Sequence, residues 1–467
     1  HCRHGRKWYP LAAAKSSKLP KIAVRQWFVK DIFGDRIYPR TARGKEMTKL
    51  AAFLHMFPPA QLELMLRLSN NNLKKAKCNE TSRGELLNFF GILILITRTN
   101  GIGNRADLWQ KPGMKTWEFL PLPDLKKTGM ARHRFEELWQ HVRWSEQDAR
   151  RHPTMSPADY RWMLVDDFVE NFNEHRKLNF SPSDLIVVDE SMSKWYGLGG
   201  FWINIGLPQY VAMERKPVSG CEIQNACCAR SRIMLQLKLV KHMDTENDYL
   251  QKHFSGDEIE KGARDTMAAL EKERSKHVDD DGNKKLHGIC VMEELLEPWE
   301  GSNRLICADS YFASVAAVQA LKKNGFYFIG VVKNATKNYP RAYLGNEFLP
   351  GRGSSSSLVS FNGSGDLEMI ALVWVDQSRR YFIANAVGIV PGEPLYRARW
   401  RQVQNDPYAD AVRKHIKINQ PKVVEVFYNA ASEIDRHNRQ RQNELMIEHK
   451  IQTIMDHNHS CKNSRSN

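Results

Sequence analysis

The sequence predicts an α/β protein in which a helical region precedes a core of strands and helices. Before residue 183, apolar residues recur at the spacing of amphipathic helices. After it, short apolar runs of strand length predominate, and a helix-like segment separates two of them, which is the pattern of a parallel sheet. Two of these runs, at 185–188 and 305–308, are each followed directly by an aspartate, Asp189 and Asp309.

The net charge of the chain is strongly positive. Its 467 residues include 69 lysines and arginines against 53 aspartates and glutamates, which is a formal net charge of +16. A basic surface of this size favours a polyanion as partner, and nucleic acid is the first expectation. The alternative is a soluble basic protein whose charges are merely solvated.

The composition excludes several classes of protein. Hydrophobic residues make up 42% of the chain, which is typical of a globular protein and not of a disordered one. No stretch reaches the roughly 18 apolar residues of a membrane span, so we expect no membrane partner. The cysteines are scattered without a C-x-x-C pair, so neither a disulfide framework nor a zinc ribbon is expected.

The first part of the chain predicts an arm and a helical domain. Residues 1–44 are basic and irregular, and we expect a flexible arm there. Residues 45–183 predict an all-helical domain, of a kind that often binds DNA although no recognition helix is evident, in which Ser82 and Glu85 have capping-box spacing and the apolar run at 89–96 indicates a buried helix. The predicted helices lie at 45–56, 60–68, from Ser82 onward, at 130–144 and at 162–172. Three tryptophans are expected to face the core of this domain, namely Trp139, Trp144 and Trp162.

The second part of the chain predicts mainly strands. The highly charged segment from about 244 to 300 indicates a helical insertion, and the glycine- and serine-rich 351–357 indicates a flexible loop. A last helix is predicted to begin at Val423 and to run through Asp435. The predicted strands lie at 185–188, 234–240, 305–308, 327–333, 369–375 and 381–384, with a helix at 315–324.

Asp189, Asp309 and Asp435 are the candidate functional acids. The carboxyl ends of parallel strands open at one edge of a sheet, where ligands bind, so we expect Asp189 and Asp309 to meet there. Taken singly, each acid has an ordinary explanation, because a strand-end aspartate often forms a turn and a helical aspartate among arginines is often a solvated ion pair. Together in a basic chain, they favour a site that holds a hard divalent cation for phosphoryl transfer.

Several short segments occur in a fixed order along the chain. They are Val188-Asp189-Glu190-Ser191-Met192, Arg215-Lys216-Pro217, Cys307-Ala308-Asp309-Ser310-Tyr311-Phe312, Gly330-Val331-Val332-Lys333 with Tyr339-Pro340, Val373-Trp374-Val375-Asp376, and Phe427-Tyr428-Asn429 before Ile434-Asp435. This ordered set resembles the transposase domain of piggyBac-type elements, within the RNase H-like group of DDE/D enzymes. The resemblance covers roughly residues 45–440.

The resemblance implies an RNase H-like catalytic core with a mostly helical flanking domain and a β-rich insertion. The core would comprise residues 184–332, including the charged insertion at about 244–300, together with residues 423–440. The β-rich insertion at 333–422 would separate the two parts of the core. Residues 441–467 would be a truncated C-terminal helical segment.

The same resemblance implies a DNA transposase. Asp189, Asp309 and Asp435 align with the catalytic aspartates of the family, which hold two magnesium ions, with manganese as a possible substitute. Asn438 stands where the family often has a further acid, and it would be a weak, neutral ligand. Water would cleave one strand at each element end, and the freed 3′-hydroxyl would then join a TTAA site. No zinc and no small-molecule cofactor is expected.

The implied partner is double-stranded DNA, bound by a homodimer in the nucleus. For the lysines among the expected DNA contacts, the alternative to a DNA-binding role is a solvated lysine pair. For the arginines, the alternative is that they line an exposed face of a helix. A domesticated, catalytically inactive DNA-binding protein of the same origin is the alternative function, and the neutral Asn438 favours it. The expected DNA-binding residues are Lys216, Lys333, Lys337, Arg436 and Arg439.

Overall fold

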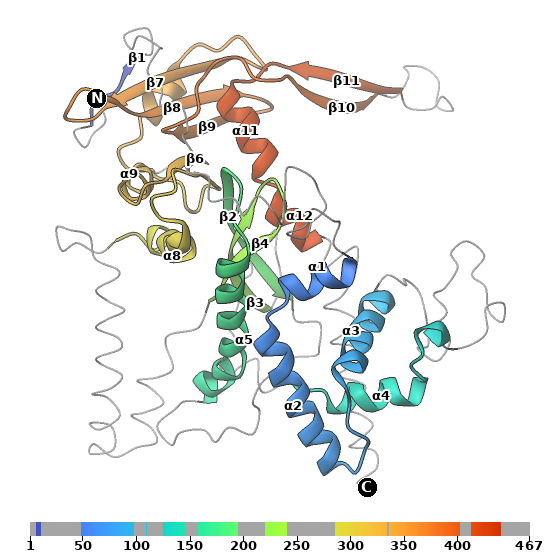
Figure 1. Cartoon of the computed structure of the whole chain (residues 1–467). Coiled ribbons are helices and arrows are strands. Elements are labelled where there is room, and N and C mark those ends of the chain that lie inside the picture. The colour runs from blue at the N-terminus through green and yellow to red at the C-terminus, as the bar shows by residue number, and fades with distance from the viewer. Residues whose placement is uncertain are drawn as a thin grey trace, which may run out of the picture.

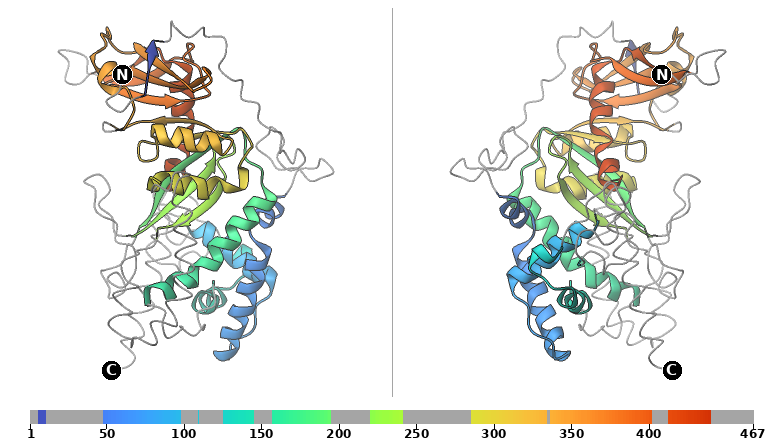
Figure 2. Two further views of the ribbon diagram at one scale, coloured as in Figure 1. Left: turned by 90° about the vertical axis from the view of Figure 1, so that its left-hand side faces the viewer. Right: turned by 90° about the vertical axis from the view of Figure 1, so that its right-hand side faces the viewer.

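A nine-stranded mixed sheet forms the centre of the protein (Figure 1). The structure is a computed structural model, and it describes residues 6–10, 48–97, 109, 125–144, 157–194, 220–240, 285–333, 336–401 and 412–439. Helices cover the middle of this sheet, and a separate group of helices lies beyond one of its ends, as the two side views in Figure 2 also show. The predicted α/β class is thus confirmed.

Five strands form the middle of the sheet. Three are a connected antiparallel meander, and the other two run parallel to the first strand on its other side. They are β2 (Leu185–Lys194), β3 (Gly220–Cys228), β4 (Met234–Leu239), β5 (Leu305–Ala308) and β6 (Tyr327–Val331). The strands predicted at 234–240, 305–308 and 327–333 are confirmed, with small shifts at their ends.

β2 is longer than predicted, and β3 was not predicted at all. The run at 185–188 pairs with β5, but β2 continues to Lys194 because β3 pairs with it as far as that residue. Asp189 therefore lies within a strand and not at its end. β3 escaped prediction because buried polar residues, Gln224 and Asn225, interrupt its apolar pattern.

Four antiparallel strands continue the sheet beyond β6. They are β9 (Arg379–Ala384), β8 (Leu367–Val375), β7 (Ser355–Phe361) and β1 (Tyr9–Pro10), so that the full order is β1-β7-β8-β9-β6-β5-β2-β3-β4. The loop predicted at 351–357 is wrong in its last residues, because the chain from Ser355 onward pairs with β8. β1 lies inside the predicted flexible arm, where Trp8 is buried and its Nε1 donates to the carbonyl of Asn338 at 3.0 Å.

The chain after β9 forms a hairpin and two helices. β10 (Leu395–Arg401) and β11 (Val412–Ile418) make a separate antiparallel sheet, which extends away from the body of the protein in Figure 1. α11 (Lys422–Ala430) and α12 (Glu433–Arg439) follow. The predicted single helix from Val423 through Asp435 is thus two helices, with a break at residues 431–432.

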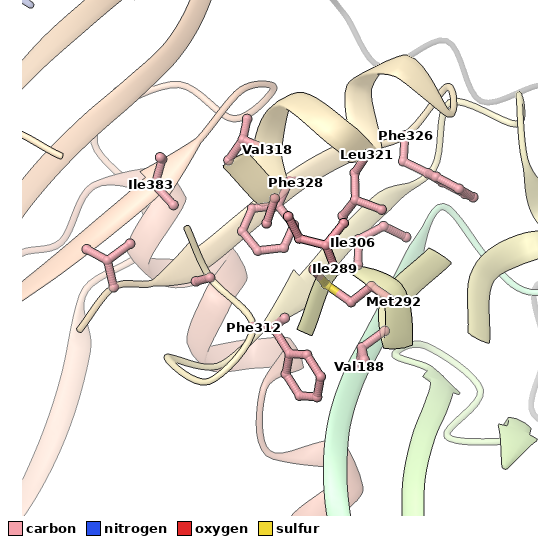
Figure 3. Packing of buried hydrophobic residues seen from close by; sticks show 14 of the residues in the cluster. Val188, Ile289, Met292, Ile306, Phe312, Val318, Leu321, Phe326, Phe328 and Ile383 are labelled. Carbon is pink, nitrogen blue, oxygen red and sulfur yellow. The ribbon is translucent and has the colours of Figure 1, made fainter. Parts of the chain in front are cut away.

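Apolar clusters cover both faces of the sheet. On one face, α8 (His287–Leu296) and α9 (Val315–Lys323) pack over β5 and β6. Two shorter helices complete this part of the chain, namely η5 (Glu297–Trp299) directly after α8 and α10 (Arg341–Asn346) after β6. Figure 3 shows Met292 of α8 and Leu321 of α9 gathered around Ile306 of β5. On the other face, Phe427 of α11 contacts Phe382 of β9 at a ring distance of 5.5 Å.

α8 falls within the segment that was predicted to be a charged insertion. Its apolar side nevertheless closes the main core, because residues spaced three and four apart along it are buried. The buried residues are Ile289, Cys290, Val291, Met292, Leu295 and Leu296. The charge that suggested an insertion therefore lies largely outside this helix in the sequence.

The helical region packs at the β4 end of the sheet. Its elements are α1 (Lys49–Met56), α2 (Pro59–Lys75), α3 (Arg83–Thr97), η4 (Leu125–Thr128), α4 (Arg132–His141) and α5 (Pro157–Asn179). The five α-helices overlap the predicted ones, although α2 and α5 are longer than predicted, and η4 was not predicted. The predicted cap of α3 is confirmed, since the N–H of Glu85 donates to Oγ of Ser82 at 3.1 Å. The run at 89–96 is not buried throughout, because Ile94 and Leu95 are exposed.

The tryptophans predicted to face the helical core differ in how far they are buried. Trp139 packs against that core, whereas Trp144 is 43% exposed although its ring stacks on Phe90. The side chain of Trp162 lies outside the described residues. Among the helices that the structure describes, none has the length and apolarity of a membrane span.

Candidate metal centre

Asp189 and Asp309 lie side by side because β2 and β5 are parallel and in register. The last residues of this pairing are Val188 and Ala308, and each aspartate comes next in its chain. The two predicted acids therefore meet at one edge of the sheet, as expected. β2 continues past this point beside β3, whereas β5 ends, so the site opens where β5 leaves the sheet.

A glycine in β6 makes room for the turn that follows Asp309. Gly330 lies beside Ala308 in the parallel ladder. A Cβ at Gly330 would lie 2.7 Å from Cβ of Ala313 and 2.8 Å from the carbonyl oxygen of Ala308. Residues 309–313 thus fold back closely over β6, and this close approach holds Asp309 at the edge of the sheet.

Glu190 joins the two aspartates as a third acid. One carboxylate oxygen from each of Asp189, Glu190 and Asp309 lies within 4.8 Å of the others, and all three residues are partly buried. Glu190 was not among the predicted site residues, and neighbouring residues of a strand normally face opposite sides of the sheet. The available signal was its position directly after Asp189 at the end of a buried apolar run.

Backbone groups orient the aspartates. The N–H of Glu190 donates to Oδ1 of Asp189 at 2.9 Å, and the N–H of Tyr311 donates to Oδ1 of Asp309 at 2.7 Å. Across the β2–β3 ladder from Asp189, the buried Asn225 donates through Nδ2 to Oγ of Ser191 at 2.8 Å. Among the residues that the structure describes, the carboxylates are therefore held by local hydrogen bonds, and no ion pair with a basic side chain is formed.

Burial and mutual repulsion raise the pKa of both aspartates. Desolvation raises the pKa of Asp189 most, and the nearby charges of Glu190 and Asp309 add to the shift. Desolvation also raises the pKa of Asp309, while the N–H of Tyr311 and the charge of Lys333 lower it in part. The site therefore concentrates negative charge, which Lys333 offsets only in part.

The donor set fits a hard divalent cation. Carboxylate oxygens are the ligands that Mg²⁺ and Mn²⁺ prefer. Oε2 of Glu190 is buried and accepts no hydrogen bond from the residues that the structure describes. A bound cation would give this oxygen a partner and would compensate the charge of the aspartates.

Asp435 and Asn438 lie on α12, which packs against β2 and β3. Ile434 is buried beneath the helix, whereas the side chain of Asp435 is exposed. The structure therefore brings Asp189 and Asp309 together but does not place Asp435 in the group of acids within 4.8 Å. Asn438 follows one turn later in the helix, and its side chain lies outside the described residues.

The turn between β3 and β4 anchors α12. Arg232 in this turn has a left-handed backbone with φ of 62°. Its Nε lies 3.2 Å from Oε2 of the buried Glu433, and its carbonyl lies 2.9 Å from Nε2 of His437. These contacts fix the helix that carries Asp435 beside β2.

The predicted DNA-binding residues have different surroundings. Lys333 and Lys337 are exposed, and Nζ of Lys333 lies 5.1 Å from the ring centroid of Tyr311, which is itself 47% exposed. Arg436 pairs with Glu433 at 3.4 Å. Lys216 and the side chain of Arg439 lie outside the described residues. Tyr311 was not predicted as a site residue, although its place two residues after Asp309 puts it beside the acids.

Comparisons with known proteins show the family of the chain and a similar fold. A family model described as Transposase IS4 matches residues 48–458. A solved structure, the cryo-EM structure of piggyBac transposase synaptic complex with hairpin DNA, is similar with a TM-score of 0.54 and 15% identity, over 89% of this chain and 76% of that chain. A search of curated proteins finds no match. The structural likeness confirms the predicted RNase H-like fold.

Proposed function

The chain belongs to the IS4 transposase family, and on this premise we propose that it is a metal-dependent DNA transposase. The observation that carries the proposal is the convergence of three carboxylates, from Asp189, Glu190 and Asp309, at the open edge of the sheet. Such a group is suited to phosphoryl transfer on DNA, where the protein supplies positioning and electrostatics.

Each acid has a proposed role. Asp189 and Asp309 would hold the metal, and Glu190 would supply a further carboxylate oxygen from the same strand. Asp435, on the neighbouring helix, would complete the site from its exposed position, with Asn438 as a weak neutral ligand. Two Mg²⁺ or Mn²⁺ ions, when bound, would activate the attacking oxygen and stabilise the leaving one.

The basic residues at this edge would hold the DNA backbone. Lys333 and Lys337 are exposed beyond the end of β6, on the side where Asp309 lies. Ammonium groups there would bind phosphates and set the register of the duplex without reading its sequence. Lys216, Arg436 and Arg439 remain further candidates for this role.

We further propose a reaction of two steps, strand cleavage followed by strand joining. Water would cut one strand at each element end, and the freed 3′-hydroxyl would then be joined to a TTAA site. A homodimer would hold two DNA ends, and the reaction would take place in the nucleus. This part rests on the resemblance of the ordered segments around Asp189, Asp309 and Asp435.

An inactive DNA-binding protein of the same family is the second candidate. Two observations favour it, namely the neutral Asn438 and the position of Asp435 outside the carboxylate group. Such a protein would keep the fold and the basic surface without turning over DNA.

A nicking assay separates the two candidates. Supercoiled plasmid is incubated with the chain in Mg²⁺, in Mn²⁺ or with a chelator, and open-circle DNA is measured. We expect metal-dependent nicking that Asp189→Asn and Asp309→Asn each abolish. Asp366→Asn, which changes an exposed acid in the β7–β8 turn, should nick like the wild type. Absence of nicking in every metal would support the inactive protein, and nicking by Asp309→Asn would refute the site.

A further inference from the structure

The two strands of the β10–β11 hairpin carry a concentrated positive charge. Neither of its strands contains an acidic residue. The basic residues of the two strands are Arg397, Arg399, Arg401, Arg413, Lys414, His415 and Lys417. The hairpin lies within the β-rich insertion predicted at 333–422, although its two strands were not predicted individually.

The hairpin is fastened to the body of the protein at its base. Ile418 is buried, and Leu395 and Ile416 pack against the cluster beneath α11. Nη2 of Arg397 pairs with Oδ2 of Asp376 at 2.7 Å, which neutralises this one arginine. Nε1 of Trp374 donates to the carbonyl of Asn419, directly after β11, at 2.9 Å.

The opposite side of the hairpin faces solvent. Tyr396 is 60% exposed, and its ladder partner Lys417 is exposed beside it. The next pair on the same side, two residues further along each strand, is Ala398 and the exposed His415. An aromatic ring and cationic side chains therefore share a surface that no described acid covers.

The hairpin and the acid cluster lie at the same edge of the large sheet. β5 and β6 both end at the edge where Asp309 lies. Because β9 is antiparallel to β6 and β8 is antiparallel to β9, the β8–β9 turn also lies at this edge. Asp376, which binds the base of the hairpin, belongs to this turn. The base thus lies three strand spacings from β5, or roughly 15 Å at about 4.8 Å per strand.

We propose that the β10–β11 hairpin binds the backbone of the duplex that is cut at the acid cluster. The proposal rests on the proposed function, since it assigns a second contact to the same DNA. The exposed Lys333 lies at the intervening edge and connects the two positions. A distance of roughly 15 Å corresponds to about four base pairs, at 3.4 Å per base pair.

The geometry of a two-stranded ribbon suits DNA. Residues two apart in a strand are about 6.8 Å apart, which equals the axial rise of two base pairs. Positions Arg413, His415 and Lys417 of β11 follow this spacing, on the side of the ladder that also carries the exposed Tyr396. A ribbon of two strands is also narrow enough to enter the major groove, which is about 12 Å wide. The repeated like charges favour a regular polyanion over an acidic patch on a protein.

The test measures how duplex binding depends on salt. The variant Arg413→Gln/Lys417→Gln removes two charges from one side of β11, the side that carries the exposed Tyr396 across the ladder. The control Lys322→Gln/Lys323→Gln removes two exposed charges from the end of α9, at the opposite edge of the sheet. Fluorescence anisotropy with a labelled 20-base-pair duplex gives the affinity from 50 to 300 mM NaCl. Each lost phosphate contact should reduce the slope of log K against log salt by about 0.9.

We expect the hairpin variant to bind more weakly and to lose about 2 from this slope, whereas the control variant keeps the wild-type slope. Arg413→Lys/Lys417→Arg keeps both charges and should keep the wild-type slope, which would show that a loss in the first variant is not caused by misfolding. A hairpin variant that matches the wild type, or a control that loses as much, would overturn the proposal. A wild-type chain that binds no duplex at any salt would contradict the proposed function itself.

Discussion

At the scale of single residues, the acids at the sheet edge concentrate negative charge that a bound cation would balance. Asp189, Glu190 and Asp309 approach within 4.8 Å, and burial raises the pKa of both aspartates. Such a cluster opposes folding unless a proton or a cation compensates it. A site of this kind is suited to binding and does not stabilise the fold.

Elsewhere in the chain, a carboxylate stabilises the fold in the ordinary way. Glu85 accepts hydrogen bonds from Nε and Nη2 of Arg134 at 2.9 and 2.8 Å, and from Oγ1 of Thr81 at 2.7 Å. Arg134 also donates to the carbonyls of Asn79 and Glu80. This network joins the start of α3 to α4, and the bonds from Arg134 lower the pKa of Glu85.

The pH dependence of stability follows from this lowered pKa. A carboxyl whose pKa is depressed by folding stabilises the protein above its unfolded pKa, about 4.3, and this stabilisation is lost as pH falls through the folded pKa. We expect Glu85→Gln to lower the free energy of unfolding by roughly 1.5–3 kcal/mol at pH 7. Urea unfolding should show this difference shrinking below about pH 4.

The matched control for this prediction is Glu63→Gln. Glu63 pairs with Arg83, but both side chains are at least half exposed, so the pair should contribute little. A loss for Glu63→Gln equal to that for Glu85→Gln, or a difference for Glu85→Gln that persists unchanged to pH 3, would contradict the account.

At the scale of elements, close packing between β6 and the turn after β5 positions Asp309. Gly330 is the residue that allows it, since even one methyl group there would meet Ala313 and the carbonyl of Ala308 at 2.7 and 2.8 Å. The turn cannot yield easily, because the N–H of Ala313 donates to the carbonyl of Asp309 at 3.0 Å. The strand and the turn thus form one unit.

Gly330→Ala should therefore destabilise the fold by about 1–3 kcal/mol through overpacking. Denaturant unfolding measures this, with Gly363→Ala as the control, because a Cβ at Gly363 would meet nothing within 4 Å. The displaced turn should also weaken metal binding at Asp309. Equal stability of Gly330→Ala and the wild type would show that the turn moves freely.

The elements also show why some of the fold could be predicted and some could not. β5 and Asp309 were predictable, because an apolar run buried on both faces and ended by an acid has one simple interpretation. β3 was not, because Gln224 and Asn225 are buried in it, and burial of polar residues depends on partners from other strands.

At the scale of the whole molecule, one sheet carries both the acid cluster and the base of the basic hairpin along the same edge. This arrangement depends on pairings between strands that are far apart in sequence, such as β6 with β9. The sequence predicted that Asp189 and Asp309 would meet, because parallel strands align their carboxyl ends. It did not predict Glu190 as their neighbour or the exposed position of Asp435, since both depend on how β2 and α12 are placed by other elements.

The central claim is that Asp189, Glu190 and Asp309 form a divalent-metal centre. Its most direct test is a calorimetric titration of Mn²⁺ into the metal-free chain. We predict saturable binding to the wild type, no binding to Asp309→Asn, and at least a tenfold weaker affinity for Glu190→Gln, since losing even an indirect partner of a metal costs roughly 10- to 100-fold. The same titration curve for the wild type and Asp309→Asn would contradict the claim.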